Sequence, residues 1–247
     1  MKAEDFTLNS NGKIRWLSFP FFQKFDFLSH GFIIKNKKQN LSTPVKKNTT
    51  KRLIKQISSE EKQIVVPQQV HGSGCMTIKK GEELKKKYKT DALLTNRKDI
   101  FLTVSVADCL PIFVFEPKRK VVGLIHAGWR GTLLGIVPET VRKTKNEFGC
   151  KPQDLTVLFG PAIQKCCYET SEAIAILFDD DCLIRSPHEK PKLDLIKANL
   201  KQFLNCGVKR EKIFVTNDCT YCKADMFHSF RRDGEKSGRM IAFLRIK

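Results

Sequence analysis

The chain of 247 residues lacks the features that would mark a membrane protein, a two-domain protein or a common nucleic-acid binder. Its longest apolar runs, 100–106 and 121–125, are far shorter than the roughly 20 residues that a membrane-spanning helix needs. No stretch rich in glycine, serine or proline divides the chain. The spacings typical of helix-turn-helix, RNA-recognition and zinc-finger modules are also missing. We therefore expect one domain, with no membrane partner and no specific nucleic-acid partner.

Histidine is scarce, and the N-terminus lacks a secretion signal. The five histidines are too few for an oxygen-reducing copper cluster, which is rich in imidazole. The chain starts Met-Lys-Ala-Glu-Asp, without a basic start that leads into an apolar run and a cleavage site. Nine cysteines are an odd number, which fits a framework of disulfides poorly. These features predict a protein of the reducing cytoplasm.

Positive charge is in large excess. Lysine and arginine number 45 against 26 acidic residues, which gives a net charge of +19. The lysines are scattered, with small clusters at 46–47, 79–80 and 85–87, and we interpret them as a solubilising surface. A basic nucleic-acid binder is the non-enzymatic alternative, and it predicts steeply salt-dependent binding to any duplex.

The pattern of apolar residues predicts an α+β fold. Strands are predicted over 14–19, 31–35, 64–70, 75–78, 91–95, 100–107, 111–115, 121–125, 155–159, 213–216 and 240–246. Helices are predicted over 51–59, 132–148, 169–178 and 193–205. We expect residues 1–247 to form a single domain, a mixed β-sheet or sandwich flanked by helices. Residues 1–60 look least regular, with a polar loop over 36–51.

Three side chains with metal-binding chemistry, His71, Cys109 and His126, each follow an apolar run. Two imidazoles and a thiolate fill three positions of a tetrahedral Zn²⁺ ion and leave the fourth for water or substrate. The gaps of 38 and 17 residues between them match no short zinc signature. Spacing alone therefore leaves open that they are a hydrogen-bonded pair of histidines and a buried thiol.

Five stretches carry a family resemblance. They are Gln-Val-His-Gly at 69–72, Ala-Asp-Cys-Leu-Pro at 107–111, His-Ala-Gly-Trp-Arg-Gly at 126–131, Gly-Pro-Ala-Ile at 160–163 with Tyr-Glu at 168–169, and Cys-Thr at 219–220 followed by Phe-His-Ser-Phe-Arg-Arg at 227–232 and Gly-Arg at 238–239. In this order, from about residue 64 to the C-terminus, they resemble the laccase-domain family. Its members are known as polyphenol oxidases and as zinc-dependent purine nucleoside phosphorylases with adenosine deaminase activity.

The resemblance implies a zinc site and substrates. It makes His71, Cys109 and His126 the metal ligands, and it implies that adenosine, inosine or methylthioadenosine reacts with phosphate. The N-terminal part departs from the family: His-Gly-Phe at 30–32 continues as Ile-Ile-Lys instead of into an arginine and a Gly-Gly-Val-Ser loop. Lys35 could replace that charge, but an ammonium group does not reproduce bidentate anion binding, so we expect weaker substrate binding.

Further residues receive roles by their place in the matched motifs. Deamination needs an activated water and a carboxylate that moves protons, and Asp108 is either that carboxylate or a group that caps the turn or orients a histidine ligand. Phosphorolysis needs cations, and Arg130 and Arg231 are the candidates. Residues assigned to the substrate pocket are Gln69, Tyr168 and Cys219, together with Arg130 and Arg231.

Two other enzyme classes fit the same ligands. A copper-dependent polyphenol oxidase is one, because two histidines and a cysteine are also the ligands of copper in blue-copper sites. A metal-free cysteine hydrolase with Cys109 as nucleophile and His71 or His126 as base is the other. Cys166-Cys167 and Cys219-x-x-Cys222 lack the partner spacing of a zinc ribbon, and we interpret all four as ordinary thiols. His188 and His228 have no ligand neighbours in sequence, which predicts surface or structural roles.

Overall fold

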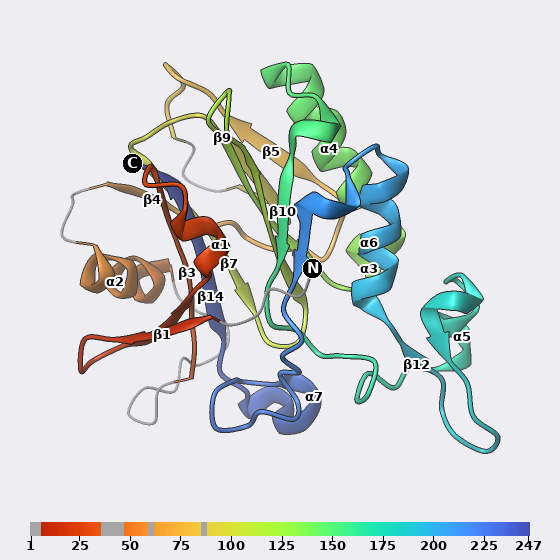
Figure 1. The fold of residues 1–247 in the computed structure, drawn as a ribbon. Helices are drawn as coiled ribbons and strands as arrows, with labels where there is room; N and C mark the ends of the chain where they lie inside the picture. Colours follow the sequence, from red (N-terminus) through yellow and green to blue (C-terminus); the bar gives the residue numbers. More distant parts are fainter. Residues whose placement is uncertain (1–5, 36–46, 59–61, 85–87) are drawn as a thin grey trace.

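The computed structural model describes residues 6–35, 47–58, 62–84 and 88–247, which form two stacked β-sheets with helices on their outer faces (Figure 1). The part of the predicted loop at 36–46 and the lysines at 46 and 85–87 lie outside the described residues. Within the described ranges, none of the helices combines the length and the apolar character required to cross a membrane.

The first sheet joins both ends of the chain. Its strands, in spatial order, are β1 (Thr7–Ser10), β2 (Arg15–Ser18), β3 (Leu28–Ile33), β14 (Met240–Ile246), β7 (Ile100–Val106) and β4 (Gln63–Val65). Neighbours are antiparallel except β4 and β7, which are parallel. The C-terminal strand β14 lies between β3 and β7, so the N-terminal region, expected to be least regular, contributes three strands to the core sheet.

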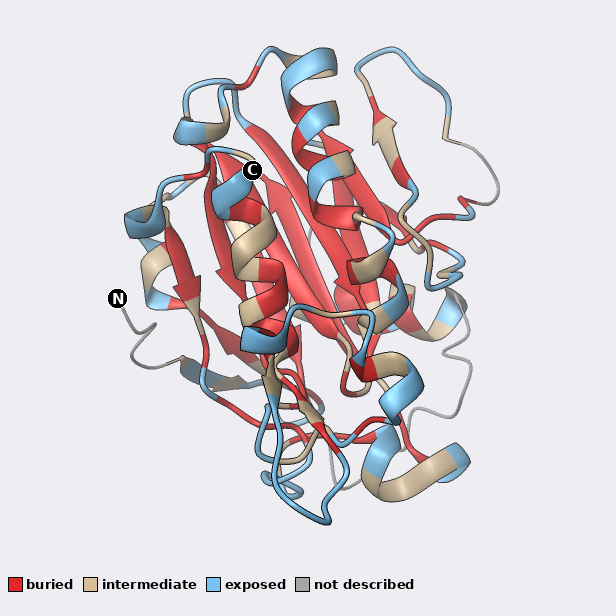
Figure 2. Cartoon of the chain, turned by 90° about the vertical axis from the view of Figure 1, so that its right-hand side faces the viewer, coloured by how far each residue is buried: buried red, intermediate tan, exposed pale blue. Residues whose placement is uncertain are grey.

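The second sheet is buried on both faces (Figure 2). Its strands, in spatial order, are β13 (Ile213–Val215), β10 (Thr156–Phe159), β8 (Leu110–Glu116), β9 (Val121–Ala127), β6 (Ala92–Thr95) and β5 (Cys75–Ile78). The β13–β10 and β6–β5 pairs are parallel and the others antiparallel. Because both faces are covered, these strands are nearly continuous apolar runs without polar alternation.

Three apolar layers hold the elements together. Side chains such as Leu244 of β14 and Leu124 of β9 meet between the two sheets. The other face of the second sheet packs against α4 (Ile136–Phe148) and α6 (Leu195–Asn205), and the other face of the first sheet packs against α2 (Lys47–Ile57). The prediction of an α+β sandwich flanked by helices is therefore confirmed.

The remaining elements are short. They are α1 (Pro20–Gln23), α3 (Trp129–Leu133), α5 (Glu172–Ala175), α7 (Phe230–Asp233), β11 (Leu183–Ile184), β12 (Lys192–Leu193) and the 3-10 turns Pro152–Asp154, Asp180–Cys182, Arg210–Lys212 and Gly234–Lys236.

Four predicted segments need correction. The helix predicted over 132–148 is two helices, α3 and α4, because Gly135 has a φ of 77° that ends the first, while Pro138 is tolerated in the first turn of the second. Residues 47–51, predicted as loop, are the start of α2. The strand predicted over 64–70 ends at Val65, and the helix predicted over 169–178 is reduced to the four residues of α5.

Candidate metal centre

His71, Cys109 and His126 lie together at one end of the sandwich. Their ligand atoms all lie within 4.8 Å of one another, and the two imidazole rings meet edge to face with centroids 4.8 Å apart. Each comes from a different place: His71 from the loop between β4 and β5, Cys109 from the turn between β7 and β8, and His126 from within β9. The fold thus brings together the three residues that the sequence predicted as ligands.

A buried carboxylate, Asp91, holds this cluster from behind. Its side chain is fully buried and accepts a hydrogen bond of 2.8 Å from Nδ1 of His126. It also accepts three backbone N–H bonds, from Val70, His71 and Gly72, at 2.9–3.1 Å. One carboxylate therefore fixes both the ring of His126 and the loop that carries His71.

The contacts of Asp91 decide which nitrogen of His126 can bind a metal. Burial raises the pKa of Asp91, but the hydrogen bonds from His126 and from the backbone of Gly72 and Val70 outweigh it, and the net pKa is lowered. A carboxylate bound to Nδ1 keeps the proton there, so Nε2 is the nitrogen that can bind a metal ion once it is deprotonated. The sequence analysis missed Asp91 because it lies 20 and 35 residues from the two histidines, just before a strand.

Charge at Cys109 is stabilised by its neighbours. Burial raises the pKa of this thiol, but the adjacent imidazoles of His126 and His71 bring it below its usual range. The charge of Cys109 and the hydrogen bond to Asp91 in turn raise the pKa of His126 despite its burial. The cysteine is therefore held as a thiolate, the form that binds metals and the form that acts as a nucleophile.

The backbone is strained where it presents the ligands. His71 and Asp108 have positive φ angles of 57° and 86°, a conformation that side chains other than glycine adopt at a cost. Gly128 lies so close that an added Cβ would be 3.1 Å from Sγ of Cys109 and 3.5 Å from Cδ2 of His71. The glycine after His126-Ala127 thus leaves space for both ligands.

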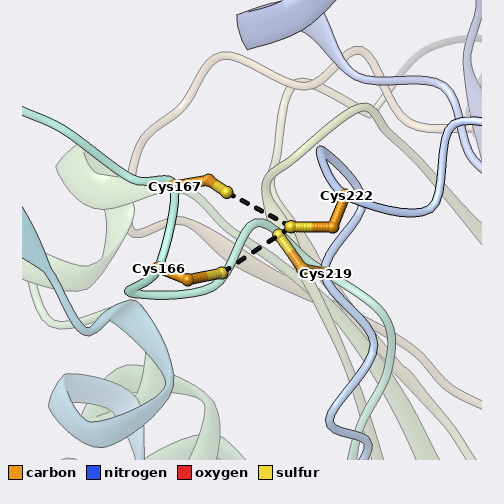
Figure 3. Close-up of side chains that lie close together, drawn as sticks. All are labelled: Cys166, Cys167, Cys219 and Cys222. Atoms are coloured by element: carbon orange, nitrogen blue, oxygen red, sulfur yellow. Dashed lines mark hydrogen bonds between the residues drawn. The ribbon is translucent and has the colours of Figure 1, made fainter.

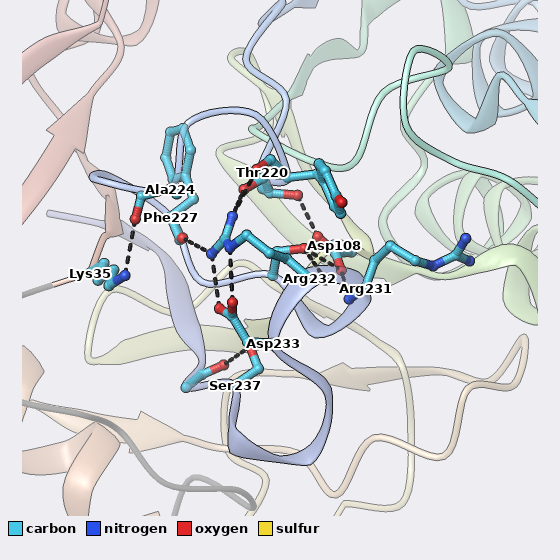
Figure 4. Close-up of polar contacts among 12 residues, drawn as sticks. Lys35, Asp108, Thr220, Ala224, Phe227, Arg231, Arg232, Asp233 and Ser237 are labelled. Carbon is cyan, nitrogen blue, oxygen red and sulfur yellow. Dashed lines mark hydrogen bonds and ion pairs between the residues drawn. The ribbon is translucent and has the colours of Figure 1, made fainter.

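Asp108 has its oxygens engaged by the C-terminal segment (Figure 4). Its Oδ1 accepts from Oγ1 of Thr220 at 2.6 Å, and its Oδ2 accepts from Oγ of Ser229 at 3.0 Å and from the backbone N–H of Arg231 at 2.7 Å. The carboxylate is buried. These contacts favour an orienting role that fixes the turn before Cys109, the second of the two alternatives for this residue.

The two predicted arginines lie on aromatic rings. The guanidinium of Arg231 lies 5.4 Å from the ring centroid of Tyr168 and donates to the carbonyl oxygen of Glu169 at 2.6 Å. Burial and the negative charges of Cys109 and Asp108 raise the pKa of Tyr168. Arg130 lies 5.0 Å from the ring of Trp129 and is exposed.

The side chains of Gln69 and Cys219, which were predicted to line the substrate pocket, make contacts with other parts of the protein. Nε2 of Gln69 donates to the carbonyl oxygen of Ser105 and its Oε1 accepts from the N–H of Ser105, both at 2.8 Å, so the amide is bound to the edge of β7. The thiol of Cys219 lies with those of Cys166, Cys167 and Cys222, within 4.8 Å of one another (Figure 3). The sequence analysis, which interpreted all four as ordinary thiols, did not predict that they lie together.

Arg239 is a further cation that the sequence analysis did not assign. Burial lowers its pKa, while the charges of Cys109, Glu235 and Asp108 oppose that shift. Its Nη1 donates to the carbonyl oxygens of Ser237 and Gly238 at 2.9 and 3.0 Å. The signal was present, since Gly-Arg at 238–239 is one of the matched motifs. Lys35, the proposed substitute cation, donates to the carbonyl oxygen of Ala224.

Fold and site together define an α+β sandwich protein with a candidate mononuclear metal centre of two histidines and one cysteine. The chain belongs to the family described as "Multi-copper polyphenol oxidoreductase laccase", whose model matches residues 25–247. The predicted family is therefore confirmed. The match begins before β3, so the departure after Phe32 lies inside the family domain.

Similar proteins share most of this fold. A protein of Geobacillus stearothermophilus named purine nucleoside phosphorylase YlmD is 33% identical in a match over 215 residues, which covers 80% of this chain and 77% of that protein. The crystal structure titled YlmD from the same organism has a TM-score of 0.86 at 27% identity and covers 98% of this chain and 100% of that chain. The protein named purine nucleoside phosphorylase YlmD of Bacillus subtilis is 34% identical over 164 residues, covering 64% of this chain and 59% of that protein's length.

Proposed function

We propose that this chain is a zinc-dependent purine nucleoside phosphorylase that acts on adenosine, inosine and methylthioadenosine. The observation that carries the proposal is the cluster of His71, Cys109 and His126, with Asp91 behind it and the exposed His71 on its open side. The relatives named purine nucleoside phosphorylase support the choice of substrate class.

The donor set fits a catalytic zinc ion. Two imidazoles and one thiolate are three ligands, a carboxylate orients one of the histidines, and the fourth position is left for water or substrate. When bound, zinc would supply a Lewis acid that polarises an oxygen or a water molecule at that open position. Copper is less suited, because the five histidines of the chain are too few for an additional oxygen-reducing cluster.

The remaining chemistry belongs to the side chains around the cluster. Phosphate carries two negative charges that must be held near the ribose, and guanidinium groups are suited to that task. Arg231, whose backbone N–H donates to Asp108, and Arg239, whose pKa is influenced by the charges of Cys109 and Asp108, are the candidate cations. Arg130 next to Trp129 is the third cation in the matched motifs. Tyr168 offers a ring on which a purine can stack, although Arg231 covers one face of it.

Adenosine deamination is the second activity that we propose, with less support from the geometry. It needs a carboxylate that shuttles protons, and Asp108 and Asp91 both have their oxygens engaged by fixed donors. We therefore expect phosphate-dependent release of the purine base to exceed deamination.

Metal analysis combined with product identification tests the proposal. The purified protein is expected to convert adenosine to adenine and inosine to hypoxanthine only when phosphate is added. His71→Ala is expected to abolish this conversion and to remove zinc from the cluster, while the exposed His188→Ala serves as the matched control. A zinc-loaded protein that leaves both nucleosides intact with and without phosphate would contradict the proposal.

A specific observation also favours a cysteine hydrolase. Cys109, His126 and Asp91 form a chain of thiol, imidazole and carboxylate, the order of a nucleophile, its base and the group that orients the base. Alkylation by iodoacetamide separates the two functions. If zinc occupies the cluster, added zinc protects Cys109, whereas a free nucleophile would be labelled at the same rate with and without zinc.

A further inference from the structure

Four cysteine thiols form a second cluster, separate from the one that contains His71 and His126. Cys166 and Cys167 come from the turn after β10, and Cys219 and Cys222 from the loop after β13 (Figure 3). Their sulfur atoms all lie within 4.8 Å of one another. Cys219 is buried, Cys167 is half-buried, and Cys166 and Cys222 are exposed.

The distances between the sulfurs suit a shared metal ion better than a disulfide. Sγ of Cys222 lies 3.3 Å from that of Cys167 and 3.9 Å from that of Cys166. A disulfide needs an S–S distance of about 2.0 Å. In a tetrahedral zinc site with Zn–S bonds of about 2.3 Å, the sulfurs are about 3.8 Å apart. The four sulfurs, all within 4.8 Å of one another, therefore lie close enough to share one Zn²⁺ ion.

The two loops are fixed to each other by their backbones. Ala162 and Cys219 form a parallel β-bridge, in which the N–H of Thr220 donates to the carbonyl oxygen of Ala162 at 3.1 Å. The guanidinium of Arg232 donates to the carbonyl oxygens of Thr220 and Tyr221 at 3.0 and 2.8 Å, which holds the Cys-x-x-Cys turn. The positions of the four sulfurs thus follow from a braced scaffold.

Backbone N–H groups point at the buried sulfur. The N–H of Gln164 donates to Sγ of Cys219 at 3.4 Å. The backbone N–H groups of Cys222 and Tyr221 also approach this sulfur. Amide donors that converge on one sulfur stabilise a thiolate, as the inner ligands of structural zinc sites require.

We propose that Cys166, Cys167, Cys219 and Cys222 bind a second, structural Zn²⁺ ion that ties the turn at 160–168 to the loop at 218–223. Four sulfur ligands fill the coordination sphere and leave no position for substrate, so the ion has no part in the reaction. The proposal does not depend on the proposed phosphorylase activity.

The four-cysteine site lies on loops that continue into residues around the candidate metal centre. Thr220, next to Cys219, donates to Asp108, whose neighbour is the ligand Cys109. Tyr168, next to Cys167, lies under Arg231. Both loops of the four-cysteine site therefore run directly into residues around the candidate metal centre, and fixing them fixes those residues.

Zinc content of matched variants tests the proposal. The wild-type chain, purified without chelator, is expected to hold about two zinc ions, and both Cys222→Ser and Cys166→Ser about one. Cys206→Ser, a half-buried cysteine outside the cluster, is the control and keeps two. His71→Ala is expected to keep one ion with sulfur ligands only, seen by X-ray absorption at the zinc edge.

A count of reactive thiols in the wild-type chain tests the proposal even if the cysteine variants fail to fold. In the wild-type chain the exposed Cys166 and Cys222 are expected to resist a thiol reagent until a chelator is added, after which both react rapidly. Immediate reaction without chelator, or an intact mass lower by two hydrogens because a disulfide has formed, would overturn the proposal. A wild-type chain whose zinc is fully lost in His71→Ala would overturn it as well. Absence of phosphorolysis with a sulfur-only zinc present would count against the proposed function alone.

Discussion

The two clusters of metal-binding side chains are built in opposite ways. His71, Cys109 and His126 come from three separate segments connected to both sheets, and His126 and the loop of His71 depend on the buried Asp91. The four cysteines come as two close pairs on two surface loops, and backbone contacts between the loops bring them together. The first cluster offers three ligands and leaves one position of a tetrahedral ion open, whereas the second offers four ligands and leaves no position open.

This difference shows what each site is able to do. An open site needs ligands that stay in place when the fourth position changes its occupant, and a rigid sheet with a carboxylate behind the ligands provides that. A closed site uses the ion itself to order loops that have little core of their own. The predictions below separate these two dependences.

Asp91→Ala is expected to have the largest effect. The substitution leaves a buried histidine and three backbone N–H groups without their acceptor, which should lower the free energy of unfolding by about 3–5 kcal/mol. Denaturant unfolding measures this change. Asp99→Ala is the control, because Asp99 forms a surface ion pair with Arg97 and its loss should cost about 0–1 kcal/mol. Equal effects of the two substitutions would show that Asp91 does not hold the open cluster.

The sequence predicted most strands and the candidate ligands that the fold brings together in the open cluster, but it did not predict the carboxylate behind them. Strands such as β5 and β14 were predictable because short apolar runs end at turns, and the family motifs contain His71, Cys109 and His126. Asp91 was not predictable, since a buried acid before a strand looks like any turn residue until the fold places it under His126. The four-cysteine cluster was missed for the same reason: the partner pairs lie more than 50 residues apart, and they are aligned by contacts of the fold such as the β-bridge at Ala162.

Chelation should separate the two sites by hydrogen exchange. If zinc is held in 100-fold excess over its dissociation constant, the closed site gains about 2.7 kcal/mol, equal to about 100-fold slower exchange of the amides that it protects. A chelator is therefore expected to accelerate exchange in the segments 162–168 and 218–223. The amides of β9, which carries His126, should be unchanged because they are bound within the sheet. Uniform acceleration in both regions would remove the distinction between a loop-ordering ion and a sheet-held one.

Gly128→Ala is expected to affect the open site alone. The new Cβ would lie 3.1 Å from Sγ of Cys109, so the ligand must move, and overpacking of this kind costs about 2 kcal/mol. Zinc affinity at the open cluster should fall about 30-fold, which corresponds to that energy, while the four-cysteine zinc stays bound. Gly74→Ala is the control, because its Cβ would meet Oγ1 of Thr90 at an ordinary 3.5 Å. Competition with a zinc indicator gives the zinc affinity of each cluster. An unchanged affinity of the open cluster in Gly128→Ala would mean that an added Cβ does not displace the ligands.

Thr220→Val should have the smallest effect and tests the connection between the clusters. It removes the hydroxyl that donates to Oδ1 of Asp108 at 2.6 Å, and the loss of one hydrogen bond to a carboxylate should cost about 1.5 kcal/mol. Ser229→Ala is the matched control, since Ser229 donates to the other oxygen of Asp108 from outside the cysteine loops. Each is combined with Cys222→Ser, and unfolding free energies of single and double variants are compared.

In this comparison the connection between the clusters is tested by the coupling energy, and not by the loss of unfolding free energy in either single variant. Once Cys222→Ser has released the cysteine loop, Thr220 no longer holds Asp108 firmly, so Thr220→Val should add less than its full cost, with a coupling of at least about 0.5 kcal/mol. Ser229→Ala should be additive, because α7 holds Ser229 whether or not the loop is ordered. Additivity in both pairs would mean that the two clusters are independent, and that the closed site stabilises its loops without positioning the turn before Cys109.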